Sequence, residues 1–136
     1  MAEKGLSNYL DEANILLAKT NFYRGNYFTA AAYFDYTAKA FGNDRQVLVK
    51  AMTWKARSLM QLNDDEKANK ALDTVALFLD SIKKDRPEAL ATLAQMHIFQ
   101  EDFKNAIKEL ETAAKESQHS NRKNSMVIHF GTTLRK

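Results

Sequence analysis

The chain lacks cysteine, and its 136 residues include only one proline and four glycines. Without thiols it cannot form a disulfide, a thiolate nucleophile or a zinc–thiolate site. Sheet proteins and phosphate-binding loops need Gly and Pro at tight turns, so their scarcity favours an all-helical fold. The sequence also has no apolar run of about 20 residues, and we therefore expect no direct membrane insertion by this segment.

The composition is that of a globular protein, with 45% hydrophobic and 27% charged residues. The length suits a single domain over residues 1–136. The net charge of +3 comes largely from the C-terminus, where Arg122, Lys123, Arg135 and Lys136 occur with no acidic residue in the last 20. Nucleic-acid binding needs a concentrated basic face. The rest of the chain has no such face, so we expect no nucleic-acid partner. The alternative, from a different functional class, is a protein that binds nucleic acid or an anionic surface through this basic C-terminus.

The sequence matches itself at a shift of 38 residues. Small and large apolar residues recur in the same order in three successive units, and a fixed period of about 20 to 50 residues predicts a stack of repeats. The aligned sets are Ala18, Ala56 and Ala94; Phe22, Met60 and Ile98; Ala30, Ala68 and Ala106; Phe34, Leu72 and Leu110; and Ala38, Ala76 and Ala114.

Each unit contains two stretches in which apolar residues recur every three or four positions, as on one face of a helix. Turn signals separate the two stretches at Gly25-Asn26, at residues 62–65 and at residues 100–102. We therefore expect three helical hairpins, over about 9–44, 46–84 and 87–117, and a terminal helix that either caps the stack or begins a truncated fourth repeat. The seven predicted helices cover about 9–24, 27–41, 46–62, 65–83, 87–100, 103–117 and 122–134.

Two further expectations concern the helices themselves. The alanines would let paired helices approach closely, with a bulky residue of the neighbour beside each one. The return helix of the second hairpin would be a turn longer than the others, and a polar loop containing His119 would precede the terminal helix.

The order Leu17-Ala18, Phe22, Gly25-x-Tyr27, Ala30 and Phe34 resembles a tetratricopeptide repeat (TPR). The third unit fits the same pattern, whereas the second departs from it, with Asp65 at the position of Tyr27 and Lys55 in place of a leucine. The resemblance spans nearly the whole chain, although TPR units usually have about 34 residues. It implies an all-α, right-handed solenoid of three hairpins plus a C-terminal capping helix, acting as a non-catalytic protein-interaction scaffold.

A narrower resemblance covers Asp11 to Phe41, Ala51 to Leu62 and Ala89 to Lys115, followed by the basic terminal helix. These segments are similar to one TPR segment of the SprE/PorW-like lipoproteins of Bacteroidota type IX secretion and gliding motility. The resemblance implies a lipoprotein fragment at the periplasmic side of the outer membrane, holding components of the secretion apparatus together. The alternative is a generic bacterial TPR adaptor, which would be cytoplasmic.

In TPR proteins the first helix of each hairpin lines a concave groove. The resemblance places nine residues there: Ile15, Lys19, Tyr23, Thr53, Arg57, Gln61, Ala91, Gln95 and Phe99. Lys19, Arg57 and Gln95 would form a ladder of donors suited to a peptide with an acidic or carbonyl-rich face. The alternative is a merely solvated inner face. A chaperone-tail clamp is disfavoured, because four other residues stand where its members would be: Ile15, Trp54, Glu88 and Thr92.

Side chains for other chemistry are sparse. His97 has only Glu101 at a co-ligand spacing, so we expect no metal site, and we expect neither a cofactor nor an enzymatic activity. Glu109 is expected to be a solvated charge. Nine aromatic residues crowd the first 41 positions, most of them expected in the core and some in a patch for a partner protein. Open ends of the stack would favour self-association.

Overall fold

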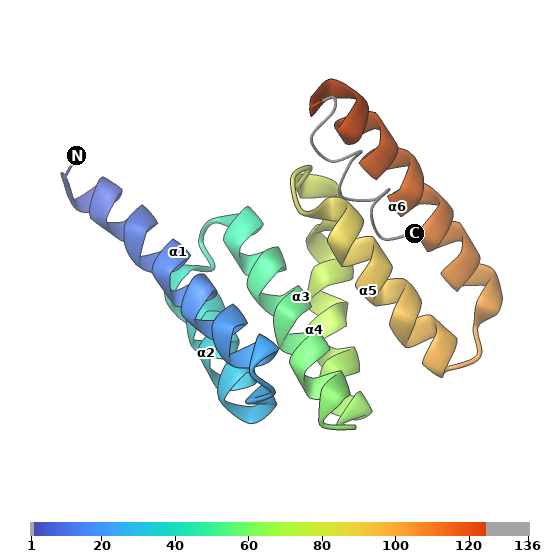
Figure 1. Cartoon of the computed structure of the whole chain (residues 1–136), viewed down its shortest axis with the longest axis horizontal. Helices are drawn as coiled ribbons and strands as arrows, with labels where there is room; N and C mark the ends of the chain where they lie inside the picture. The colour runs from blue at the N-terminus through green and yellow to red at the C-terminus, as the bar shows by residue number, and fades with distance from the viewer. Residues whose placement is uncertain (1, 125–136) are drawn as a thin grey trace.

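The computed structural model describes residues 2–124, with side chains described over residues 9–118, and these residues are helical with no strand among them. Three helical hairpins follow one another along the chain (Figure 1). The elements are α1 (Ala2–Tyr23), α2 (Tyr27–Phe41), α3 (Arg45–Gln61), α4 (Asp65–Phe78), the 3₁₀ helix η1 (Leu79–Ser81), α5 (Arg86–Phe99) and α6 (Phe103–Asn124). The all-α prediction is therefore confirmed.

The three hairpin turns share one backbone conformation, 38 residues apart. Gly25, Asn63 and Glu101 have φ values of 86°, 60° and 61°, in the left-handed region. The amide of each donates to the carbonyl three residues back, and the following amide donates to the carbonyl five residues back. This is the Schellman arrangement that ends a helix, so the predicted turn signals act as expected.

Aspartates begin three of the helices. The Asp44 carboxylate accepts from the amide of Gln46 at 2.9 Å, and Asp64 accepts from the amide of Lys67 at 3.2 Å. Asp102 does the same for Asn105 at 3.3 Å. Each carboxylate satisfies an amide that has no partner within the helix, which fixes where the helix starts.

The end of the second hairpin differs from the prediction. α4 stops at Phe78 instead of extending to residue 83, so it is not longer than the other return helices. The Arg86 guanidinium donates to the Leu79 carbonyl at 3.0 Å and to the Asp80 carboxylate at 3.2 Å, which caps this end. The chain then becomes extended at Ile82, whose side chain is buried.

The two ends of the described chain also differ from the prediction. α1 begins at Ala2 instead of about residue 9. α6 continues to Asn124, so the expected polar loop at residues 118–121, including His119, is helical. That stretch contains neither Gly nor Pro, and its polarity alone does not break a helix. Of the predicted terminal helix, residues 122–124 belong to α6 and the rest lie outside the described residues.

The alanines of the first two aligned sets, at positions 18, 56 and 94 and at positions 30, 68 and 106, are all buried. They lie where the two helices of each hairpin meet, as predicted. The third set differs: Ala38 is buried, whereas Ala76 and Ala114 are exposed. Ala38 is covered because α3 packs extensively along α2, whereas α5 contacts α4 only slightly and leaves Ala76 exposed. Ala114 lies on α6, the last of the described helices.

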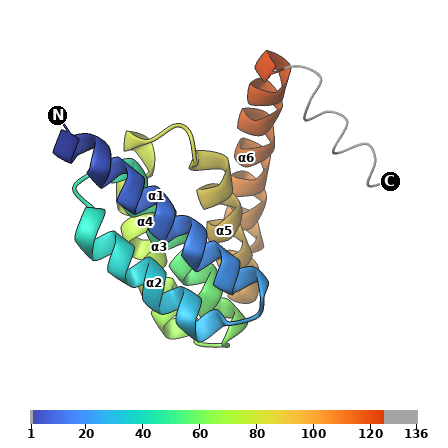
Figure 2. The same cartoon turned by 60° about the vertical axis from the view of Figure 1, so that its left-hand side comes forward.

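Consecutive hairpins pack through their first helices. α3 contacts α1 on one side and α5 on the other, which places α1, α3 and α5 next to one another on one face (Figures 1 and 2). We call this surface the first-helix face. The arrangement is consistent with a solenoid of stacked helical hairpins.

Candidate functional site

The first-helix face is organised around the single tryptophan of the chain. Trp54 of α3 is 2% exposed. Its ring stacks on Phe34 of α2 at 6.0 Å between centroids and meets Phe22 of α1 edge-on at 5.2 Å. Tyr23, also on α1, meets it edge-on at 5.9 Å. Trp54 thus joins the first hairpin to the second.

Two cations lie over the outer side of this ring. The Lys19 ammonium is 4.6 Å from the Trp54 centroid, and the Arg57 guanidinium carbon is 4.2 Å from it. Burial lowers the pKa of Lys19 below its usual value, and the nearby Glu88 carboxylate opposes that shift. A cation held against an indole face with part of its water removed is attracted by the ring quadrupole.

Glu88 of α5 completes the group. Its carboxylate accepts a hydrogen bond from the Trp54 indole nitrogen at 3.1 Å and forms an ion pair with Arg57 at 3.5 Å. One carboxylate therefore ties the third hairpin to the second. We call Lys19, Trp54, Arg57 and Glu88 the Trp54 cluster; its members come from α1, α3 and α5.

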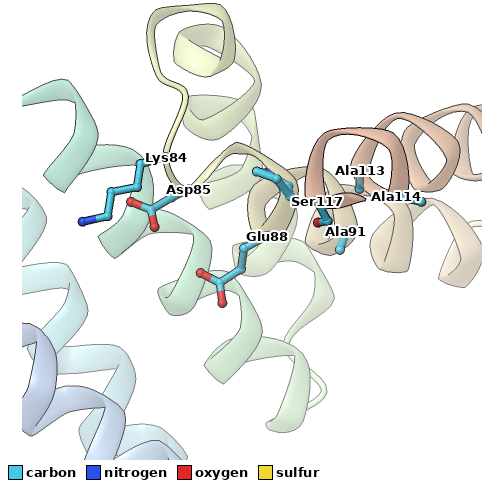
Figure 3. A pocket seen from close by; sticks show the side chains of 8 residues that line it. Lys84, Asp85, Glu88, Ala91, Ala113, Ala114 and Ser117 are labelled. Carbon is cyan, nitrogen blue, oxygen red and sulfur yellow. The ribbon is translucent and has the colours of Figure 1, made fainter. Parts of the chain in front are cut away.

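Glu88 of the cluster lines one cavity, and a second cavity shares part of its lining with the first. The first has a volume of about 560 Å³ and is lined by Lys84, Asp85, Pro87, Glu88, Ala91, Ala113, Ala114 and Ser117. Figure 3 shows the carboxylates of Asp85 and Glu88 on its α3 side, and the three alanines on the other side, where α5 meets α6. The second has a volume of about 310 Å³ and is lined by Asp11, Glu12, Ile15, Asp44, Gln46, Val47, Lys50, Lys84 and Asp85. Lys84 and Asp85 line both.

The smaller cavity, which we call the acidic cleft, has four carboxylates and two ammonium groups in its lining. Lys50 lies 3.9 Å from Asp85, a distance that leaves both groups partly available. Burial raises the pKa of Asp11, and the neighbouring Glu12 and Asp44 carboxylates add to this shift. Excess negative charge in a partly enclosed cleft attracts a cation.

The structure brings only some of the predicted groove residues together. Lys19 and Arg57 meet on Trp54, and Tyr23 lies beside them with most of its surface exposed. Four more of the predicted groove residues are exposed: Gln61, Ala91, Gln95 and Phe99. Of these, only Ala91 lines one of the two cavities. Of the three donors in the predicted ladder, Lys19 and Arg57 therefore lie together, and Gln95 lies apart from them.

Two predicted groove residues point inward instead. Thr53 is 2% exposed, and its hydroxyl is buried without a hydrogen-bond partner. Ile15 is also buried and reaches the surface only as part of the wall of the acidic cleft. The reason is that each lies on the inner side of its helix, near residues that pack against the neighbouring hairpin.

The two central members, Trp54 and Glu88, are not predicted from the sequence as part of a binding site. From the sequence, both residues only disfavour a chaperone-tail clamp. A usable signal is that Trp54 is the only tryptophan and lies on the helix that carries Arg57, three residues before it. The pairing with Glu88, 34 residues away, has no sequence signal.

A histidine and a glutamate from different helices come together in the third hairpin. His97 of α5 is 2.7 Å from the Glu109 carboxylate of α6, so the prediction that Glu109 is a solvated charge is wrong. No three metal-ligating side chains come together in the part of the chain that the structure describes. The side chains of Arg122 and Lys123 are not described, and Arg135 and Lys136 lie outside the described residues.

No protein-family model, curated protein or solved structure matches this chain. Among the described helices, none combines the length and the apolar character that crossing a bilayer requires. We therefore infer function from the chemistry of the first-helix face itself.

Proposed function

We propose that this chain is a non-catalytic protein-interaction scaffold that binds a segment of another protein along the first-helix face. The Trp54 cluster carries this proposal. It gathers two partly exposed cations and a partly exposed carboxylate from three hairpins around one buried indole. Arg57 and the exposed Tyr23 beside the cluster are of the residue types that usually anchor protein interfaces.

The chemistry of the face suits a segment with both charges. Lys19 and Arg57 offer donors to an acidic or carbonyl-rich stretch, and Gln95 lies on the same face. The adjacent acidic cleft suits a Lys or Arg of the same segment, because carboxylates outnumber ammonium groups in its lining. Exposed Tyr23 and Phe99 add apolar contact area on α1 and α5.

The single tryptophan provides the assay. Short synthetic peptides with an acidic stretch, the same stretch followed by lysine, or only neutral residues are titrated while Trp54 fluorescence is recorded. We expect the acidic peptides to shift the emission by displacing Lys19 or Arg57 from the ring. The mixed peptide should bind most tightly.

A double variant, Lys19→Gln/Arg57→Gln, should weaken that binding by roughly tenfold or more. Lys67→Gln/Lys70→Gln, which removes the same charge from exposed positions of α4, is the matched control and should change affinity less than about twofold. Equal losses in the two double variants would show that overall charge, and not the Trp54 cluster, drives binding. Absence of binding by every peptide would refute this face as a peptide site.

A narrower proposal follows from the sequence resemblance alone. We propose that the chain is a TPR segment of a SprE/PorW-like lipoprotein, located at the periplasmic side of the outer membrane and acting in type IX secretion and gliding. The hairpin stack and the binding face are compatible with that role, and a generic TPR adaptor has the same features. A source genome without type IX secretion genes would refute the narrower proposal and leave the scaffold proposal standing.

A further inference from the structure

α1 presents an apolar stripe that nothing in the described part of the chain covers. Leu16 is 65% exposed, and Tyr9, Leu10 and Leu17 are exposed with it, on the side of α1 opposite Ile15 and Ala18. Ala13 lies among them and is also exposed. These five residues, which we call the α1 stripe, include no charged side chain.

α6, at the other end of the stack, presents a second stripe of the same kind. Ile107 is 55% exposed and Leu110 is 43% exposed, with Phe103 and Ala114 exposed beside them. We call these four residues the α6 stripe, and it is also uncharged. The buried face of α6, at Ala106 and Ala113, contacts α5 instead.

The 38-residue register shows what each stripe corresponds to. Leu16 stands at the repeat position of Trp54, and Ala13 stands at that of Ala51, both of which are buried on α3. Leu110 stands two repeats after Phe34, and Ile107 stands two repeats after Ala31, both buried on α2. The joint between α2 and α3 is centred on the stacked rings of Phe34 and Trp54. The α6 stripe is therefore the α2 half of that joint, and the α1 stripe is the α3 half.

We propose that a second copy of this chain covers these stripes, with α6 of one copy packed on α1 of the next. In this contact Leu110 and Ile107 take the places of Phe34 and Ala31, and Leu16 takes the place of Trp54. The intermolecular joint then continues the internal stack with the packing that α2 and α3 already use. Since the two surfaces differ, the contact is head-to-tail, and it builds chains or closed rings.

The test uses the full chain and two single variants, Leu16→Glu and Leu110→Glu. Sedimentation velocity and light scattering should show a mass that rises with concentration for the unmodified chain. Each variant places a charge in the contact and should weaken association by roughly thirtyfold or more. Leu77→Glu, at an exposed leucine of α4 outside both stripes, is the matched control and should associate like the unmodified chain. Circular dichroism checks that each variant keeps its helices.

Mixing the two variants gives the decisive result. Leu16→Glu keeps an intact α6 stripe and Leu110→Glu keeps an intact α1 stripe, so an equimolar mixture should form a one-to-one dimer and nothing larger. A chain that stays monomeric at all concentrations would overturn the proposal. Association that survives either single variant would also overturn it, because it would indicate a symmetric contact. A monomer that Leu110→Glu destabilises would overturn it as well, because another segment of the same chain would then cover the α6 stripe.

Discussion

Replacing Trp54 with alanine should remove the main joint between the first two hairpins. The indole is almost fully buried and packs against Phe22, Tyr23 and Phe34. Truncating a buried aromatic to Ala costs about 3–5 kcal/mol through lost burial and the cavity it leaves. The free energy of unfolding of a domain of this length is about 5–15 kcal/mol in total, so the variant should still fold, with a Tm lower by about 10–20 °C.

Trp54→Phe separates packing from hydrogen bonding. It keeps an aromatic ring but removes the donor to Glu88, so we expect a smaller loss of about 1.5–3 kcal/mol. Urea unfolding followed by far-UV circular dichroism measures both variants, since neither retains a tryptophan. Phe28→Ala, at an exposed aromatic of α2, is the control and should lie within about 0.5 kcal/mol of the unmodified chain. A loss below about 1 kcal/mol for Trp54→Ala would refute the view that this side chain holds the hairpins together.

Two further predictions concern the backbone and charge. Glu101 has a φ of 61° and Gly25 has a φ of 86°, a region that favours glycine, so Glu101→Gly should stabilise the fold by about 0.5–1 kcal/mol and Gly25→Ala should destabilise it by a similar amount. Urea unfolding measures both changes, and effects of the opposite signs would exclude the left-handed turns. Burial raises the pKa of Asp35, but hydrogen bonds from Lys55 and Lys39 outweigh it and lower that pKa below 3.8. The stability that Asp35 contributes is therefore present above its unfolded pKa and is lost as pH falls through its folded pKa. Asp35→Asn should cost up to about 1 kcal/mol at pH 7, and the difference should vanish in acid; a pH-independent difference in unfolding curves would contradict this assignment.

The hairpins are predictable because their signals are local. Gly25 and Asn63 act through their own backbone conformation, and Asp102 acts through a carboxylate that caps the next helix. The alanine positions follow from helical periodicity. The end of α4 is not predictable, because Arg86 caps it through the Leu79 carbonyl from seven residues further along the chain. The continuity of α6 departs from the prediction because a polar stretch favours a loop only when it also contains residues that break a helix.

The candidate site is predictable only in part, for a similar reason. Helical spacing places Lys19 and Arg57 on adjacent first helices, and the structure brings them to one ring. The tertiary contact between Trp54 and Glu88 depends on how α5 packs on α3, which no local pattern specifies. Thr53 and Ile15 are buried and do not face the groove as expected, because one helical position separates an inward side chain from an outward one.

The Glu88 carboxylate is a polar link between α3 and α5, beside the apolar packing of Ala89 and Leu93 in the core that the second and third hairpins share. A ligand that competes for the indole hydrogen of Trp54 or for Arg57 would therefore remove one polar link between the second and third hairpins. Binding at this surface and the packing of α5 on α3 would then be coupled, and each would change the free energy of the other by the same amount. A change in how α5 packs on α3 would then report that a ligand is bound.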